Sequence, residues 1–255
     1  SDKKLSKGQI LFNGLRNFVQ YGPTNPFNDV LPEAEMAAID PTELTDLLHN
    51  LTSFEHRILF YGPQSIDRAE EVLAAHHKVP DTWIPSPEAK EYPELPIENS
   101  RVYFAEYDMV QAELMLMSRG QAYSEAVLPQ AKIFNEYFGS GLSSIVFQEI
   151  RESKALAYSA YAVYTSPDEA DEHHYVRGYI GTQVNKLEDA TNALLELMST
   201  LPRADRQFEQ AKISALKQIE TNRVTGRSIL WSYERAQKLG VDYDLNQKIY
   251  PEIKK

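Results

Sequence analysis

Arg151 and Tyr158 are two side chains whose types and spacing suit the binding of an anionic oxygen. An arginine carries a permanent positive charge and five hydrogen-bond donors, and a tyrosine hydroxyl is a neutral donor because its pKa lies near 10. Spacing alone favours a plainer alternative, in which Arg151 lies on a solvated helix face and Tyr158 occupies an ordinary position in a sheet.

The elements that must position these side chains are a turn, a helix and a strand. Gly139 and Gly141 predict the turn, because glycine adopts backbone conformations that are closed to other residues, and the serines that follow are candidate N-caps of the helix. The helix should end near Lys154, since the residues after it alternate with the two-residue period of a strand. Arg151 therefore projects from the last part of the predicted helix, and Tyr158 lies at the start of the predicted strand.

This segment resembles the pitrilysin/insulinase family of zinc metallopeptidases, in the half that does not hold zinc. The family pattern is a glycine-rich turn, a Ser-Ser pair, a Phe, an Arg, and a Tyr seven positions after the Arg. Here these elements are Gly139, Gly141, Ser143, Ser144, Phe147, Arg151 and Tyr158. Ser140, Ile145 and Ala155 stand where glycine, arginine and glycine are common, and these departures leave Arg151 and Tyr158 in place.

The resemblance implies that Arg151 and Tyr158 act on a peptide next to a zinc site that the other half of the enzyme holds. The pair would bind the substrate in a closed chamber and stabilise the tetrahedral intermediate of a zinc metalloendopeptidase. The implied partners are the zinc-binding half, in the same protein or in a partner subunit, and peptide substrates. The alternative is a catalytically inactive homologue that acts as a scaffold or partner-binding subunit.

The sequence itself contains no zinc motif. The catalytic motif of the family is His-x-x-Glu-His on a helix, and none of the six histidines begins it. His76 and His77 are adjacent on a predicted helix and point about 100° apart. His173 and His174 lie in an acidic segment that we expect to be a solvated loop. We predict no metal site and no cofactor in this chain, with zinc in the other half.

Composition narrows the classes of partner. The chain has 255 residues, 42% of them hydrophobic, and a formal net charge of −11, which is typical of a soluble globular protein and unfavourable for binding nucleic acid or anionic lipid. No apolar run approaches the ~20 residues that cross a bilayer, so we expect no membrane insertion. The absence of cysteine excludes disulfides and thiolate chemistry. We expect the protein in the bacterial cytoplasm or periplasm, and the sequence does not choose between these compartments.

The order of the predicted elements indicates an α+β fold. Hydrophobic periodicity and capping signals predict helices over 5–21, from Pro41, after Ser65, over 124–138 and in most of 185–239, and strands over 57–61, 101–107, 110–117, 158–164 and 175–182. This order suits a mainly antiparallel sheet that helices cover on one face. The resemblance implies the same architecture, a metallopeptidase-like domain.

Proline content predicts where two domains join. Five of the fourteen prolines lie between residues 80 and 96, a composition that favours a stiff, extended connection. We therefore predict a linker at 80–98, the C-terminal portion of a preceding α+β domain at 1–79, and most of a second at 99–255, without its final helix and strand. Because the chain begins without Met and stops within an apparent helix, we expect a fragment.

Overall fold

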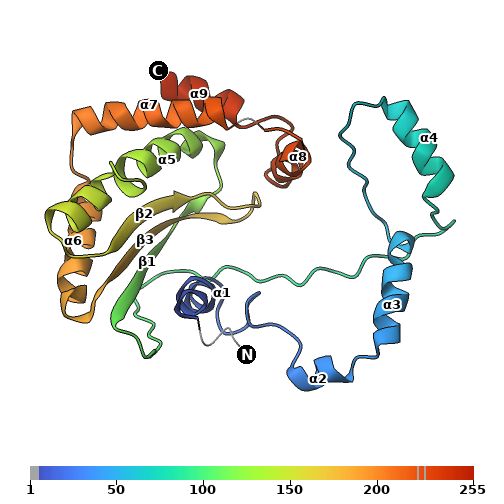
Figure 1. The fold of residues 1–255 in the computed structure, drawn as a ribbon, viewed down its shortest axis with the longest axis horizontal. Coiled ribbons are helices and arrows are strands. Elements are labelled where there is room, and N and C mark those ends of the chain that lie inside the picture. The colour runs from blue at the N-terminus through green and yellow to red at the C-terminus, as the bar shows by residue number, and fades with distance from the viewer. Residues whose placement is uncertain (1–5, 223, 227) are drawn as a thin grey trace.

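A three-stranded antiparallel sheet organises the C-terminal part of the chain in the computed structural model, which describes residues 6–222, 224–226 and 228–255. The strands are β1 (Gln111–Ala122), β2 (Ser159–Thr165) and β3 (His173–Gln183), in the order β1-β3-β2 (Figure 1). Leu114 of β1 and Ala160 of β2 both pair with Ile180 of β3. Since directly paired residues point to the same side, these three side chains share one face.

Helices cover the face of the sheet that carries these three apolar side chains. They are α5 (Leu128–Phe134), the π-helical segments η5 (Asn135–Gly139) and η6 (Phe147–Ser153), α6 (Leu187–Thr200) and α7 (Asp205–Thr221). Phe138, Ile150 and Leu194 are fully buried there against Ile180 of the sheet. Each such side chain contributes about 1.5–3 kcal/mol on burial, so this layer holds the strands together. The predicted α+β class is confirmed.

The N-terminal helix lies on the opposite face of the sheet (Figure 1). It joins the π-helical segment η2 (Gln9–Leu15) to α1 (Arg16–Tyr21). The ring of Phe12 lies 5.3 Å from the ring of Tyr179, and the ammonium of Lys7 lies 2.7 Å from the carboxylate of Glu113 in β1. An aromatic contact and an ion pair therefore attach a segment from the start of the chain to the sheet.

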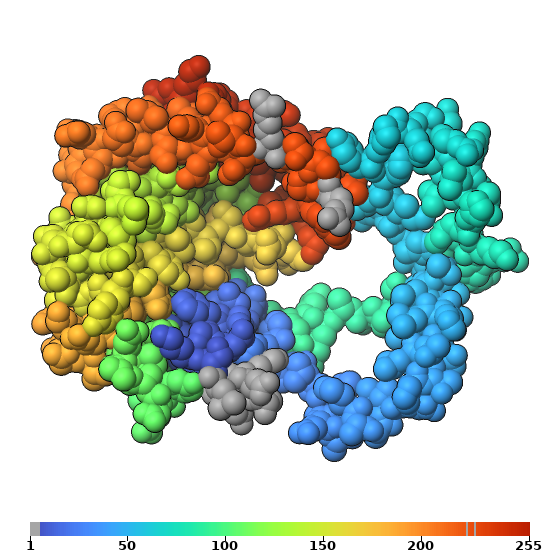
Figure 2. Space-filling view, in the orientation of Figure 1, coloured from blue at the N-terminus to red at the C-terminus, as the bar shows by residue number. Residues whose placement is uncertain are grey.

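Residues 29–110 form an arm that follows the N-terminal helix and returns to the start of β1 (Figures 1 and 2). Its helices are α2 (Glu33–Ala38), α3 (Pro41–His49) and α4 (Ile66–His76). Asp40 accepts a hydrogen bond from the backbone N–H of Thr42 at 2.8 Å, and Ser65 accepts one from that of Arg68 at 3.3 Å, so both predicted N-caps form. The proline-rich return, residues 85–109, contains no helix or strand.

Two last helices close the described chain. They are α8 (Ser228–Lys238) and α9 (Asn246–Lys254), and α9 packs on α5 and α7. Lys238 of α8 lies 2.9 Å from Glu169, and Arg235 lies 3.4 Å from Asp168, in the hairpin loop between β2 and β3. The acidic loop is thus paired with basic side chains of α8. No helix of the described residues is long and apolar enough to cross a membrane.

Three local predictions are wrong. Residues 57–61 and 101–107 form no strand, because a strand needs a neighbouring strand and, among the described residues, the sheet consists of β1, β3 and β2. His173 and His174 do not lie in the loop but begin β3, whose pairing with β1 extends to Ala122. His174 is fully buried and stacks on the ring of Tyr123.

Candidate functional site

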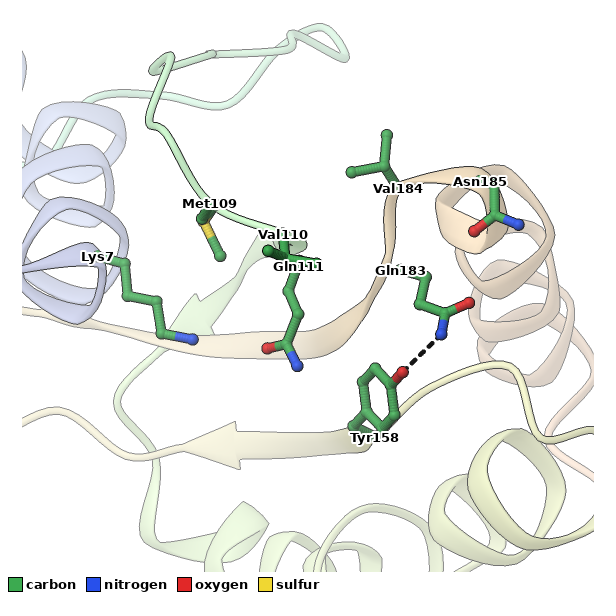
Figure 3. A pocket seen from close by; sticks show the side chains of 8 residues that line it. All are labelled: Lys7, Met109, Val110, Gln111, Tyr158, Gln183, Val184 and Asn185. Carbon is green, nitrogen blue, oxygen red and sulfur yellow. Dashed lines mark hydrogen bonds between the residues drawn. The ribbon is translucent and has the colours of Figure 1, made fainter.

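A pocket of about 750 Å³ opens at the end of the sheet where Tyr158 lies (Figure 3). Its lining residues come from the N-terminal helix, the end of the arm, the start of β1, the residue before β2, the end of β3 and the turn after β3: Lys7, Met109, Val110, Gln111, Tyr158, Gln183, Val184 and Asn185. The strand register brings these residues together. Gln111 at the start of β1 pairs with Gln183, and Ser159 at the start of β2 pairs with Gly181.

Tyr158 is attached to β3 at two points. Its backbone N–H donates to the carbonyl of Gly181 at 2.9 Å, and its hydroxyl oxygen accepts from Nε2 of Gln183 at 2.6 Å. The side chain is 53% exposed. The strand β2 begins one residue later, at Ser159, so the sequence placed Tyr158 at the strand start to within one residue. The ring lines the pocket and its hydroxyl is accessible to a bound molecule.

Arg151 lies in η6, the helical segment that precedes Tyr158. Ser144 caps this helix as predicted, since its Oγ accepts from the backbone N–H of Phe147 at 3.4 Å. The guanidinium of Arg151 lies 4.8 Å from the ring centroid of Phe147, and its Nε lies 3.7 Å from the carboxylate of Glu152. Arg151 is half exposed and does not belong to the residues that line the pocket. The structure therefore gives Tyr158 a pocket and leaves Arg151 on the surface of the helix before it.

The turn between these two side chains has an unusual backbone. Ala155 has a φ of 48°, in the left-handed region that favours glycine. The carbonyl of Ala155 accepts from Nζ of Lys186 at 3.0 Å, and the N–H of Leu156 donates to the carbonyl of Ile150 at 2.9 Å. This conformation supplies a physical reason for the glycine that is common at position 155, and the hydrogen bonds hold the turn without it.

The two glycines before the helix have different roles. A Cβ at Gly139 would lie 1.6 Å from the carbonyl oxygen of Ala162 in β2, so Gly139 allows a helix end to touch a strand backbone. Gly141 has a φ of 93° and open space around it, so it is needed for its backbone conformation. Together they fix where the helix of Arg151 begins relative to β2.

The charges beside the pocket are compensated. Lys7, which lines it, is paired with Glu113. Burial, with a smaller effect of Glu113, raises the pKa of Tyr179 to about 12, so this tyrosine stays protonated over the range in which proteins function. The neighbouring Arg177 has its pKa lowered by burial and by the positive charge of Arg16. Among the residues that line the pocket, Lys7 is the charged one and none is a carboxylate, and most of the lining surface is apolar.

Sequence reasoning missed Gln183, Gln111 and Asn185, whose amides line the pocket. Gln183 is separated from Tyr158 by a whole β-hairpin, and only the antiparallel pairing brings the two together. A hairpin with a loop at 166–174, in which Thr165 faces Tyr175, places residue 182 opposite Tyr158, and that count was the available signal.

The described residues contain no group of three or more His, Cys, Asp or Glu side chains that could hold a metal ion. In the arm, the Nε2 atoms of His56 and His77 lie 2.7 Å apart, and Nδ1 of His56 lies 2.6 Å from the carbonyl oxygen of Phe54. The distance between the two Nε2 atoms is that of a hydrogen bond between the rings.

Comparison with known proteins matches residues 50–219 to the family model described as peptidase M16 inactive domain. A stretch of 105 residues, 40% of the chain, is 30% identical to the uncharacterized zinc protease YmxG of Bacillus subtilis (strain 168) and covers 25% of that protein. The chain thus spans about a quarter of the length of the curated relative that it matches.

Two solved structures share the fold. A mutant of the ferredoxin protease FusC, in complex with Arabidopsis ferredoxin, matches with a TM-score of 0.68 and 12% identity, over 99% of this chain and 28% of that one. A protease from Helicobacter pylori matches with a TM-score of 0.63 and 13% identity, over 93% of this chain and 58% of that one.

Proposed function

The chain belongs to the peptidase M16 inactive-domain family, and from this premise we propose that it forms part of the non-zinc half of a zinc-dependent endopeptidase that cuts peptides in a closed chamber. The observation that carries the proposal is the family's Arg and Tyr pattern in a segment whose tyrosine hydroxyl is accessible in a pocket. The similarity to a bacterial zinc protease supports the same reaction class.

In this proposal Tyr158 supplies a neutral hydrogen-bond donor to the substrate oxygen. When the peptide carbonyl is attacked by water, its oxygen gains negative charge, and a donor aimed at that oxygen stabilises the transition state. Removing one such donor typically costs about 2.7–4 kcal/mol. The exposed hydroxyl of Tyr158 has the chemistry for this role.

Arg151 does not line the pocket in this structure, so in this proposal its guanidinium turns toward the bound peptide, where its permanent positive charge binds the substrate and the same oxygen. Its five donors and its half exposure support this role, and among the described residues the guanidinium contacts the ring of Phe147 and, at a longer distance, the carboxylate of Glu152. Zinc belongs, in this proposal, to the other half of the enzyme, which supplies the activated water.

The organisation of the whole enzyme is also a proposal. We divide the chain into the C-terminal portion of one domain at 1–79, a linker at 80–98 and most of a second domain at 99–255. The extended segment 85–109 supports this division. The partner is the zinc-binding half, in the same protein or in a second subunit, and the substrates are peptides. FusC is a ferredoxin protease, and for this chain we propose peptide substrates.

The test is the turnover of an internally quenched fluorogenic peptide by the enzyme that contains this chain and its zinc-binding half. Tyr158→Phe and Arg151→Gln should each lower kcat/KM by about 100-fold to 1000-fold. Tyr233→Phe, at a 46% exposed tyrosine of α8, and Arg203→Gln, at an exposed arginine paired with Asp205, are the matched controls and should retain wild-type turnover. Turnover within twofold of wild type in both test variants would refute the assigned roles and favour the scaffold alternative.

A further inference from the structure

A single side-chain hydrogen bond holds the hydroxyl of Tyr158. Nε2 of Gln183 lies 2.6 Å from the phenol oxygen, and Figure 3 shows the amide reaching from the end of β3 to the ring. Within the described residues, no second hydrogen bond reaches this oxygen. The backbones of the two residues are fixed as well, because the N–H of Tyr158 donates to the carbonyl of Gly181 on the same strand as Gln183.

The direction of this bond decides what the phenol can do. An amide nitrogen carries two hydrogens and only donates, whereas a phenol has one hydrogen and can also accept. When Gln183 donates to the phenol oxygen, the phenol's own proton must point elsewhere. The side of the hydroxyl that is not occupied by Gln183 faces the pocket, so this proton is available to a bound acceptor.

The other polar residues of the pocket lining do not compete for this proton. Lys7 is a donor only and is paired with Glu113 at 2.7 Å. The amides of Gln111 and Asn185 line the pocket without a hydrogen bond to Tyr158 in the part of the chain that the structure describes. Gln183 is therefore the side chain whose chemistry determines the orientation of the hydroxyl.

We propose that Gln183 is a positioning residue, which accepts no proton from Tyr158 and thereby keeps the tyrosine hydroxyl aimed as a donor at a peptide carbonyl oxygen in the pocket. The catalytic consequence rests on the proposed function of Tyr158. The orientation of the Tyr158 hydroxyl does not depend on that proposed function, and it can be measured in this chain alone.

The first measurement is NMR of the chain labelled with ¹⁵N, which detects the side-chain amide of each glutamine. Tyr158→Phe removes the acceptor and should shift the side-chain amide protons of Gln183 upfield. The amide of Gln111, which lines the same pocket without this bond, is the internal control and should keep its position to within a small ring effect. Amide protons of Gln183 that do not move, or that move no more than those of Gln111, would overturn the proposal.

The second measurement is a double-mutant cycle in the complete enzyme. Gln183→Glu keeps the shape but replaces the donor by a carboxylate, which accepts the phenol's proton and removes it from the substrate. We expect kcat to fall about tenfold with KM little changed, which is the scale of one hydrogen bond. In a Tyr158→Phe background the same substitution should have no further effect, because there is no hydroxyl left to orient.

The controls separate positioning from a structural role. Gln183→Met removes the amide without adding a charge and should lower kcat less than Gln183→Glu does. Gln237→Glu, on α8 and bonded to the carbonyl of Val241, adds the same charge elsewhere and should leave turnover unchanged. If Gln183→Glu lowers turnover equally with and without the Tyr158 hydroxyl, the residue acts through the fold and the proposal fails. Full activity of Tyr158→Phe would instead refute the proposed function, and the NMR result would then decide the positioning alone.

Discussion

Adding one methyl group at Gly139 tests whether close packing fixes the turn before Arg151. A Cβ at this position would lie 1.6 Å from the carbonyl oxygen of Ala162 and 2.5 Å from its carbonyl carbon. The obstacle is the backbone of β2, so no side-chain rotation relieves it. Gly139→Ala therefore forces the end of η5 away from the strand.

The size of the effect follows from the distances. Cβ atoms essentially never approach another heavy atom closer than 3.0 Å, so the separation must grow from 1.6 Å to at least that value. Phe138 and Ala162, next to the contact, are both fully buried and would have to move with it. Overpacking a core by small groups costs about 1–3 kcal/mol, and a backbone obstacle places Gly139→Ala above that range, at more than about 3 kcal/mol.

Gly141→Ala is the matched control, because it adds the same methyl group two residues away. Gly141 has a φ of 93°, and no atom lies within 4 Å of the position that a Cβ would take, so only backbone strain opposes the substitution. We expect a loss of about 1–2 kcal/mol. Urea unfolding of the chain, followed by far-ultraviolet circular dichroism, gives both free energies of unfolding by linear extrapolation.

A loss at Gly139 that is no larger than the loss at Gly141 would refute the packing argument. A second variant sharpens the test. Adding Ala162→Gly to Gly139→Ala should not restore stability, because the clash involves the carbonyl of residue 162 and not its side chain. Recovery in the double variant would show that a side-chain contact had been the obstacle.

Three further substitutions test the supports of the sheet. Burial lowers the pKa of His174, so below about pH 6.5 the unfolded chain binds more protons at this residue than the folded chain does. The free energy of unfolding should therefore fall from pH 7 to pH 5. His174→Phe should make this decline smaller, as measured by the midpoints of urea unfolding. Asn135→Leu removes both hydrogen bonds to the backbone of Tyr164 and should cost about 2–3 kcal/mol, with faster exchange of the Tyr164 amide; unchanged exchange would contradict this. Ser144→Ala removes the cap of Phe147 and should cost about 1 kcal/mol; no change in unfolding would rule the cap out.

Local signals predicted much of the fold correctly. The caps at Asp40, Ser65 and Ser144 form as expected, because each is a contact between residues two or three positions apart. The strand at 175–182 and the helix that leads to Arg151 also appear, since their hydrophobic periods continue over several residues. These confirmed predictions depend on residues that are neighbours in the chain.

Two predicted strands do not form; the prediction fails because a local pattern does not show whether a segment has a partner strand. Residues 101–107 alternate like a strand, yet Val102 and Phe104 are 92% and 83% exposed and lie outside the sheet. The beginning of β3 was misplaced because acidic neighbours made 173–174 read as loop, while pairing with β1 and burial of His174 made it strand. Pairing depends on segments far apart in the sequence, which a local pattern does not contain.

The sequence by itself determined the family pattern, the helix and the strand that carry Arg151 and Tyr158, and the turn that glycine permits, because each depends on residue types at short spacing. Only the tertiary structure decided that Gln183 holds the tyrosine hydroxyl and that Lys7 and Gln111 share its pocket. The reason is the antiparallel register, which places one end of β3 beside the starts of β1 and β2 and so joins side chains from three distant parts of the chain.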